Sequence, residues 1–330
     1  MTNLRRRAVL VGSTAVALGA PAIVKAQNLA QAGDWPKGPI KIIVPFPPGG
    51  STDPVARIIQ AKLIETTGWN VLVDNKPGGT GVVGAAVAAK SAPDGQTWMV
   101  TFDSHILNPA FAPSLPYKDS ELMNVMQIGR TPQAIAAHPD RPYKTFADVV
   151  ADAKKRPGKV SMGVLAASQA LVLMTLVKKE NDVDINLIPY KGGGPVSQDL
   201  LAGVTDIGIQ SLASFSPHIV AKKVRPIAVT GETRTPALPD TSTLIEQGVK
   251  GFPSYSWWGV YAPAGTPRPI VDRMHAEITK AVRLPDVTKK FVEQFNMEIL
   301  TSSPEAFAAY QKSEQERWFK VIKDNDIKGD

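Results

Sequence analysis

The chain has 330 residues, with 37 Lys and Arg, 30 Asp and Glu, and no Cys. The lack of Cys excludes disulfides, thiolate metal sites and cysteine nucleophiles. Four of the basic residues, Arg5, Arg6, Arg7 and Lys25, lie in residues 1–26, which hold no acid, so the remainder has 33 basic and 30 acidic residues. A net charge of only +3, without a long basic run, argues against nucleic-acid binding.

The N-terminal segment has the layout of a secretory signal peptide. A basic start is followed by the small and apolar run 8–23 and by Val24-Lys25-Ala26, a small-x-small cleavage site. We therefore expect cleavage near Ala26 and export to the periplasm, by the twin-arginine or the Sec route. No later segment approaches the about 18 uninterrupted apolar residues of a membrane span.

The elements that follow alternate between strand and helix. Apolar runs predict strands at 40–44, 70–74 and 96–102. A helix is expected from Asp53, a good N-cap, to Gly68, and a second helix at 83–90. This β-α-β-α-β order is typical of a doubly wound parallel sheet.

The same order restarts in the second third of the chain. Further strands are predicted at 125–131, 134–137, 160–164, 185–189, 207–210 and 227–230, with helices at 145–155 and 168–179 and another that ends at Ala202-Gly203. An aromatic, strand-like segment at 251–263 precedes helices at 269–282 and 304–323. About 300 residues of this pattern suffice for two α/β units, each with its own core.

Two glycine-rich turns follow the first two strands. Pro45–Asp53 reads PFPPGGSTD, and Pro77–Ala85 reads PGGTGVVGA. A turn between a strand and a helix leaves backbone N–H groups free at a helix N-terminus, which suits an anion. The two turns together predict a pocket for a negatively charged small molecule.

One interpretation of the second turn is a dinucleotide site. Gly79-Thr80-Gly81-Val82-Val83-Gly84 fits G-x-G-x-x-G, and Asp103 lies at the end of the next strand, where an acid binds a ribose. An exported oxidoreductase is thus an alternative. Against it, the pattern does not follow the first strand, the four His residues show no metal spacing, and no G-x-S-x-G elbow is present.

A set of ordered motifs favours a different class. The chain resembles the Bug family, the periplasmic substrate-binding proteins of tripartite tricarboxylate transporters, along essentially the whole mature length. The motifs are IIVPFPPGGSTD with Ala56-Arg57, VDNKPGGTG, APDG, PYKG, DLLAG with Asp206, RPIAVT, ALPD, WWG, APAGTP and Arg317-Trp318.

The resemblance implies two doubly wound α/β lobes joined by a hinge, as in type II periplasmic binding proteins, with the ligand enclosed between them. Domain I would comprise 27–128 plus 251–330, and domain II 129–250. It also implies a monomeric receptor without catalysis, cofactor or metal, which delivers a small organic acid to the transporter's membrane subunits. A receptor that signals to a two-component kinase is an alternative.

The resemblance further implies that the two glycine turns grip one carboxylate of the ligand. Phe46 would wall the ligand or belong to the core, and Asp53 would contact it, cap a helix or pair with Arg57. Ser104 and His105 would line the cleft or be ordinary loop residues. The candidate residues of this half are Phe46, Gly49, Gly50, Ser51, Thr52, Asp53, Gly78, Gly79, Thr80, Gly81, Ser104 and His105.

The second half of the site departs from the family pattern. Where relatives carry a Ser/Gly-rich loop before a helix, this chain has Ala166 and Ala167, and Ser168 is either a contact or a helix N-cap. Gln210 and Ser211 follow a predicted strand and offer further polar contacts. We therefore expect a less polar far side, suited to a mono-, di- or tricarboxylate with an apolar or aromatic remainder.

Overall fold

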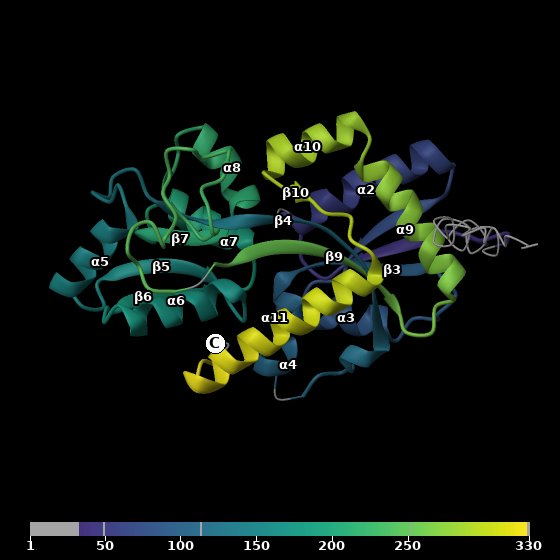
Figure 1. Ribbon diagram of the computed structural model, residues 1–330, viewed down its shortest axis with the longest axis horizontal. Helices are drawn as coiled ribbons and strands as arrows, with labels where there is room; N and C mark the ends of the chain where they lie inside the picture. Colours follow the sequence, from purple (N-terminus) through teal and green to yellow (C-terminus); the bar gives the residue numbers. More distant parts are fainter. Residues whose placement is uncertain (1–32, 49, 113, 252, 329–330) are drawn as a thin grey trace, which may run out of the picture.

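The computed structural model describes residues 33–328 except 49, 113 and 252; the expected signal peptide lies outside the described residues. Its centre is a sheet of ten strands, flanked by helices on both sides (Figure 1). The strands are β1 (Ile40–Val44), β2 (Val71–Asn75), β3 (Thr97–Phe102), β4 (Leu122–Ala137), β5 (Val160–Leu165), β6 (Ile185–Tyr190), β7 (Ile207–Ser211), β8 (Arg225–Val229), β9 (Tyr255–Pro263) and β10 (Glu298–Ile299).

The order across the sheet is β2-β1-β3-β9-β4-β7-β5-β6, with β8 and β10 paired to β4. β1 runs parallel to β2 and β3, and β5 runs parallel to β6 and β7. β9 is antiparallel to both β3 and β4. Each end of the sheet is therefore a parallel α/β unit, called here the first lobe (β1–β3) and the second lobe (β5–β7). The expected fold, two doubly wound α/β lobes, is confirmed.

β4 joins the two lobes as one long strand, although the sequence predicts two shorter ones. It pairs with β9 from Leu122 to Pro132 and with β7 from Gln133 to Ala137. The strand changes its partner without changing direction, so its backbone groups stay paired across the junction. Local sequence pattern cannot reveal this, because the partners come from distant parts of the chain.

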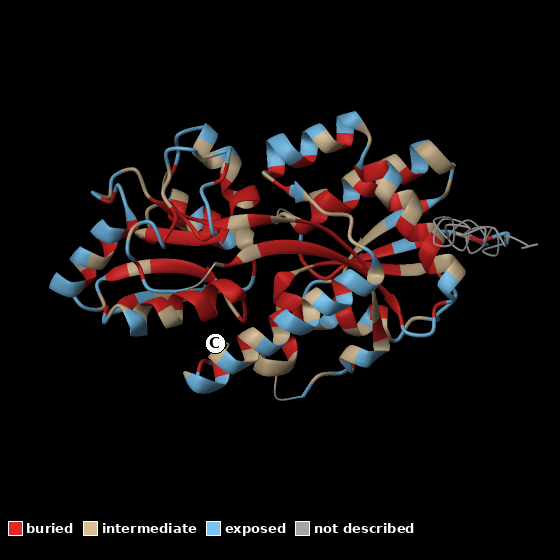
Figure 2. Ribbon diagram, viewed as in Figure 1, coloured by how far each residue is buried: buried red, intermediate tan, exposed pale blue. Residues whose placement is uncertain are grey.

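The helices cover both faces of the sheet with their exposed sides outward (Figure 2). They are α2 (Thr52–Thr67), α3 (Val82–Ala89), α4 (Asn108–Phe111), α5 (Phe146–Lys155), α6 (Gln169–Glu180), α7 (Gly193–Leu201), α8 (Leu212–Val220), α9 (Arg268–Val282), α10 (Pro285–Phe295) and α11 (Pro304–Asp324), with 3-10 turns η1 (Gly79–Gly81), η2 (Asp103–Leu107) and η3 (Asp119–Glu121). The sequence pattern did not predict α4, α8 and α10. α11 contacts both β4 and α6, and α10 contacts α8, so the two C-terminal helices reach helices that cover the second lobe.

Helix ends follow the expected chemistry at two places. Thr145 caps α5, because its hydroxyl accepts the N–H of Asp148 at 3.2 Å. Gly68 ends α2 in the left-handed conformation, with φ of 73°. The start of α2 differs from the prediction: its N-cap is Ser51, so Asp53 lies within the first turn.

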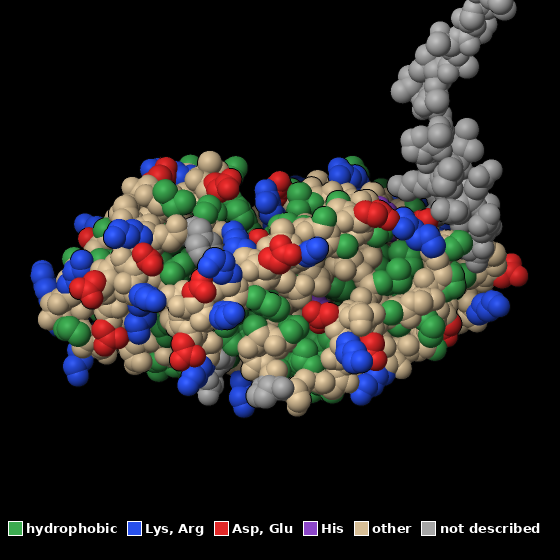
Figure 3. Space-filling model, turned by 60° about the horizontal axis from the view of Figure 1, so that its bottom comes forward, with side chains coloured by type: hydrophobic (Ala, Val, Ile, Leu, Met, Phe, Trp, Pro, Cys, Tyr) green, Lys and Arg blue, Asp and Glu red, His purple; other side chains and the backbone are tan. Residues whose placement is uncertain are grey.

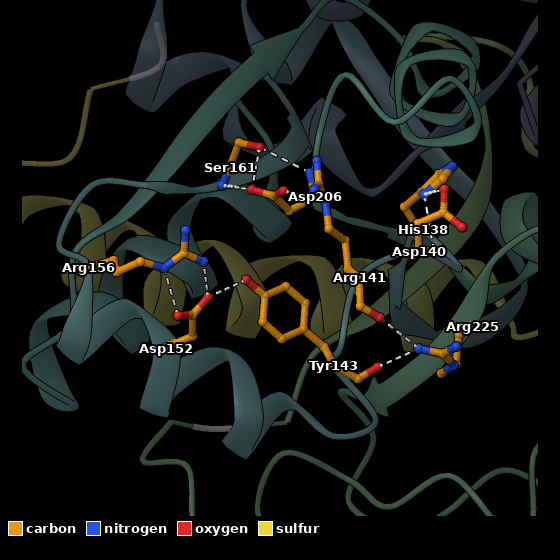
Figure 4. Close-up of polar contacts among 9 residues, drawn as sticks. All are labelled: His138, Asp140, Arg141, Tyr143, Asp152, Arg156, Ser161, Asp206 and Arg225. Carbon is orange, nitrogen blue, oxygen red and sulfur yellow. Dashed lines mark hydrogen bonds and ion pairs between the residues drawn. The ribbon is translucent and has the colours of Figure 1, made fainter.

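The loop after β4 is held to the second lobe by a polar network (Figure 4). The guanidinium of Arg225 donates hydrogen bonds to the carbonyl oxygens of Pro139, Arg141 and Tyr143, at 3.0–3.1 Å. Arg141 also pairs with Asp206, N to O 2.7 Å. These basic side chains therefore serve the fold of the second lobe, far from the strand ends where a ligand would lie.

The same network fixes α5. The hydroxyl of Tyr143 donates to Asp152 at 2.6 Å, and Arg156 forms an ion pair with the same carboxylate. The hydrogen bond from Arg156, followed by that from Tyr143, lowers the pKa of Asp152 to about 2. Asp152 is thus ionised in the folded protein at neutral pH.

Candidate functional site

A pocket lies between the two lobes, at the carboxyl ends of the parallel strands. Its cavity of about 90 Å³ is several times the about 10–15 Å³ that one water molecule needs. Ligand sites of α/β proteins commonly occupy this edge, where the loops after neighbouring strands converge. The first lobe and the β4–β9 junction contribute Phe46, Pro47, Pro48, Gly50, Ser51, Thr52, Phe102, Asp103, Gln133 and Ser256; the second lobe contributes Leu165, Ser168, Ala170, Gly192, Gly193, Gly194, Pro195, Ile209, Gln210, Ser211 and Ser214.

Four helix N-termini converge on this pocket. The N-cap residues of α2, α6, α7 and α8 all belong to its lining: Ser51, Ser168, Gly192 and Ser211. Each N-terminus carries roughly half a positive charge and up to four N–H groups without intrahelical partners. No side-chain hydrogen bond caps α2, α7 or α8 at its described N-cap residue, so these N–H groups are available to a ligand.

The side chains of the lining supply hydrogen-bonding groups and very little charge. Among the described lining residues the only ionisable side chain is that of Asp103. Burial is the main cause that raises the pKa of this carboxyl well above its ordinary value. Positive partial charge at the described lining therefore comes from helix ends, since no Lys, Arg or His belongs to it.

Polar side chains of the second lobe are ordered by mutual contacts. The Gln210 amide donates to the Ser197 hydroxyl at 2.8 Å, and the hydroxyls of Ser211 and Ser214 lie 3.0 Å apart. Ser168 accepts the N–H of Leu171 at 3.2 Å, so it caps α6 and also lines the pocket. The two roles that the sequence analysis weighed for Ser168 are compatible.

The structure brings seven of the predicted site residues together in the lining: Phe46, Gly50, Ser51, Thr52, Ser168, Gln210 and Ser211. Gly49 lies outside the described residues. Asp53 does not belong to the lining. Its carboxylate pairs with Arg57 at 2.9 Å and accepts the amide of Asn75 at 2.9 Å, which ties α2 to the end of β2.

The second glycine turn lies behind the pocket wall. Gly78, Gly79, Thr80 and Gly81 are outside the lining, and a Cβ on Gly81 would stand 3.3 Å from the ring of Phe46. Gly78 to Gly81 all have positive φ, between 52° and 140°, which explains the glycines at three of the four positions. This turn packs against Pro45 and Phe46 of the first loop, on the side away from the pocket. Contact of its N–H groups with the ligand stays a prediction.

Ser104, His105, Ala166 and Ala167 are also absent from the lining. His105 is buried among aromatic rings, 5.0 Å from Tyr261 by ring centroids, and burial lowers its pKa to about 4. It is therefore a neutral core residue. Leu165 and Ala170 are the apolar residues that line this part of the pocket.

Several lining residues were not predicted. Gly192 entered only as the last residue of the PYKG motif, and the sequence pattern did not single out Gly193, Gly194 and Pro195, although this is a glycine turn after a strand like the other two. Phe102 ends β3 and Asp103 follows it; the sequence pattern pointed to Asp103 only as a ribose ligand. Gln133 and Ser256 lie where β4 and β9 cross between lobes, a position that only the tertiary fold defines.

Comparison with known proteins agrees with this geometry. Residues 55–327 match the model of the family described as "Tripartite tricarboxylate transporter family receptor". A protein of Pseudomonas sp. (strain P51), described as a UPF0065 protein in the tcbD-tcbE intergenic region, is 36% identical and covers 98% of this chain and 95% of its own length. Protein BugT of Bordetella pertussis is 32% identical over 99% of both chains.

Solved structures of similar fold include proteins that bind small carboxylates. An R. palustris protein solved with adipate is 32% identical, with a TM-score of 0.85 over 89% of this chain and 99% of its own. MatC from Rhodopseudomonas palustris, with bound malate, is 27% identical, with a TM-score of 0.80 over 87% of this chain and 100% of its own.

Two α/β lobes with a pocket between them define a solute-binding receptor. The chain belongs to the tripartite tricarboxylate transporter receptor family.

Proposed function

We propose that this receptor binds a small dicarboxylate between its lobes and delivers it to the membrane subunits of a tripartite transporter. The observation that carries the proposal is the convergence of four helix N-termini on a pocket without a cationic side chain among its described residues. Backbone N–H groups at helix ends bind carboxylates without a Lys or Arg partner. The adipate and malate of the two solved relatives support the same ligand class.

The distribution of polar groups supports two carboxylates and not one. The first lobe offers the start of α2 with Ser51 and Thr52, and the second offers the starts of α7 and α8 with Ser211. Apolar side chains in the lining, among them Phe46 and Ile209, suit a short hydrocarbon link. The sequence-based expectation of an apolar or aromatic remainder stays a prediction, since Leu165 and Ala170 favour it while Gln210 and Ser214 do not.

We propose lobe closure as the mechanism, with 27–128 plus 251–330 as domain I and 129–250 as domain II. A ligand that touches both lobes stabilises the closed arrangement, because only that arrangement provides both sets of contacts. Such a receptor binds its ligand without chemical change and acts as a monomer, without cofactor or metal. Docking of the closed form on the membrane subunits would complete delivery.

We further propose that the protein acts in the periplasm after cleavage near Ala26. In the part of the chain that the structure describes, no helix is long and apolar enough to cross a membrane. The face shown in Figure 3 carries basic and acidic side chains intermixed, which favours a small solute over nucleic acid as the partner.

The family match and the place of the glycines favour a receptor over a dinucleotide enzyme. Gly79, Gly81 and Gly84 of the G-x-G-x-x-G pattern do not line the pocket, and a Cβ on Gly84 would meet Pro45. A receptor that signals to a two-component kinase would use the same pocket; neighbouring genes for a large and a small membrane subunit would favour transport, and adjacent two-component genes would favour signalling.

Calorimetry of the purified mature protein tests the proposal. We expect adipate or malate to bind at least about tenfold more tightly than hexanoate, because the second carboxylate reaches the helix starts of the opposite lobe. Dimethyl adipate, which keeps the chain length and lacks both charges, is the matched control. Equal affinity for hexanoate and adipate, or tightest binding of benzoate, would contradict the two-carboxylate assignment.

A further inference from the structure

An acid lines this anion pocket. Asp103 is the first residue of η2, directly after β3, and β3 is paired in parallel with β1, which leads into the loop before α2. Its carboxyl group therefore lies at the sheet edge where the first carboxylate of the ligand is expected. The side chain is buried, at 1% exposure, and belongs to the lining.

The hydrogen bonds of Asp103 leave one oxygen without a partner. The Ser256 hydroxyl and the Ser104 backbone N–H both interact with the carboxyl as donors. The Oδ2 atom is buried and has no hydrogen-bond partner among the described residues. A buried polar atom of this kind is costly unless something else satisfies it. The pocket is where a partner can enter.

The surroundings of Asp103 oppose its ionisation. α11 packs against η2 and brings the carboxylate of Glu314, while Tyr310 of the same helix also interacts with Asp103. Glu314 is engaged by Arg317 and by the indole of Trp318, each at 3.0 Å. On β9 the facing group is the neutral Ser256.

The neighbours of Asp103 on η2, β9 and α6 carry no positive charge that would favour its ionised form. His105, on η2 itself, is neutral because its pKa lies near 4. Tyr261 of β9 is buried, and burial raises its pKa well above the ordinary value. Gln169 begins α6, which packs against η2, and is uncharged. Burial, the largest cause, raises the pKa of Asp103 and outweighs the hydrogen bonds from Ser256 and Ser104, which lower it; the negative charge of Glu314 also favours the neutral acid.

We propose that Asp103 is a specificity residue that stays protonated and donates its O–H to a carboxylate oxygen of the bound ligand. With Ser256 and Ser104 as donors and Oδ2 without a partner, a protonated carboxyl has its O–H free to donate into the pocket. An ionised Asp103 would repel an anionic ligand. The inference rests on the proposed function, because it requires an anionic ligand in this pocket.

The consequence is that ligand affinity depends on the protonation of the receptor. Where Asp103 is protonated before binding, affinity is independent of pH. Above its pKa in the free protein, binding requires uptake of one proton, so affinity falls tenfold per pH unit. Raising the pH above the pKa of Asp103 in the free protein therefore lowers the affinity for the ligand, although the ligand itself carries at least as much negative charge at higher pH.

The first experiment is calorimetry with adipate from pH 7 to pH 9, where both carboxylates of the ligand are ionised, on the mature protein and on Asp103→Asn. We expect the wild-type affinity to be constant at low pH and to fall at high pH, with proton uptake visible as a dependence of the enthalpy on the buffer. Asp103→Asn keeps a donor and cannot ionise, so its affinity stays within about threefold of the low-pH wild type and no longer falls. Asp103→Leu, which lacks the donor, should bind about tenfold more weakly at every pH.

Asp119→Asn is the matched control. Burial also raises the pKa of Asp119, whose partner is Gln315, but Asp119 does not line the pocket. This variant should reproduce the wild-type pH profile. A wild-type affinity that rises with pH, or identical profiles for wild type and Asp103→Asn, would overturn the proposal.

Infrared spectroscopy gives a readout that needs no ligand. The free wild-type protein at pH 7 should show the carbonyl stretch of a protonated carboxylic acid, and Asp103→Asn should lack it. Absence of this difference band overturns the proposal whether or not adipate binds. If the band is present and no dicarboxylate binds, the proposed function fails separately, and with it the assigned hydrogen bond to ligand.

Discussion

Gly84→Ala is expected to destabilise the protein by about 1–3 kcal/mol and to weaken ligand binding, although Ala favours helices over Gly by about 1 kcal/mol. A Cβ at this position of α3 would lie 2.6 Å from the Cα of Pro45 and 2.8 Å from the carbonyl oxygen of Lys76. Both are backbone atoms, so neither can move aside by a side-chain rotation. α3 must therefore move away from β1 or push the loop that lines the pocket.

Thermal unfolding measures the stability part of this prediction, and adipate calorimetry the binding part. Val87→Ala on the same helix is the control: Val87 is 39% exposed, and its replacement also raises helix propensity. We expect this control to change the free energy of unfolding by less than about 0.5 kcal/mol. If Gly84→Ala were as stable as the wild type, the close approach of α3 to β1 would be refuted.

Two adjacent glycines at the start of α7 provide the second large effect. A Cβ on Gly193 would lie 2.4 Å from Oε1 of Gln210, whereas a Cβ on Gly194 meets nothing within 4 Å. Gly193→Ala must displace the Gln210 side chain, which is held to Ser197 and lines the pocket. We expect affinity for adipate to fall about tenfold, equivalent to about 1.4 kcal/mol.

Gly194→Ala adds the same methyl group one residue further along and should change affinity less than about threefold, under half of the tenfold effect in free energy. Calorimetry on the two variants, with unfolding temperatures as a check on folding, makes the comparison direct. Equal losses at both positions would mean that the backbone of α7, and not the Gln210 side chain, sets the effect. If neither variant lost affinity for adipate, the start of α7 would not belong to the binding site.

The first lobe was predictable because its elements are defined locally. The strand at Ile40–Val44, the glycine turn after it and the helix ended by Gly68 are marked by apolar runs, turn residues and a cap within a few residues of one another. The same local chemistry located Ser168 and Ser211 at strand-to-helix junctions, and both line the pocket.

What the sequence could not provide is the distance between such junctions. Both glycine turns have the composition of an anion site, yet only the first lines the pocket, because the second lies behind Phe46. Asp103 and Gln133 reach the pocket through strands whose partners are far away in the chain. An acid in an anion pocket also runs against charge complementarity, and its neutral form becomes evident only from its burial.

A crystal structure of the mature protein grown with adipate tests the central claim most directly. We expect one carboxylate within about 2.7–3.2 Å of the backbone nitrogens at the start of α2 and the other at the starts of α7 or α8, with the hydrocarbon chain of adipate against Phe46 and Ile209. A structure in which no carboxylate oxygen contacts these helix starts, or in which adipate binds elsewhere on the protein, would contradict the proposed site.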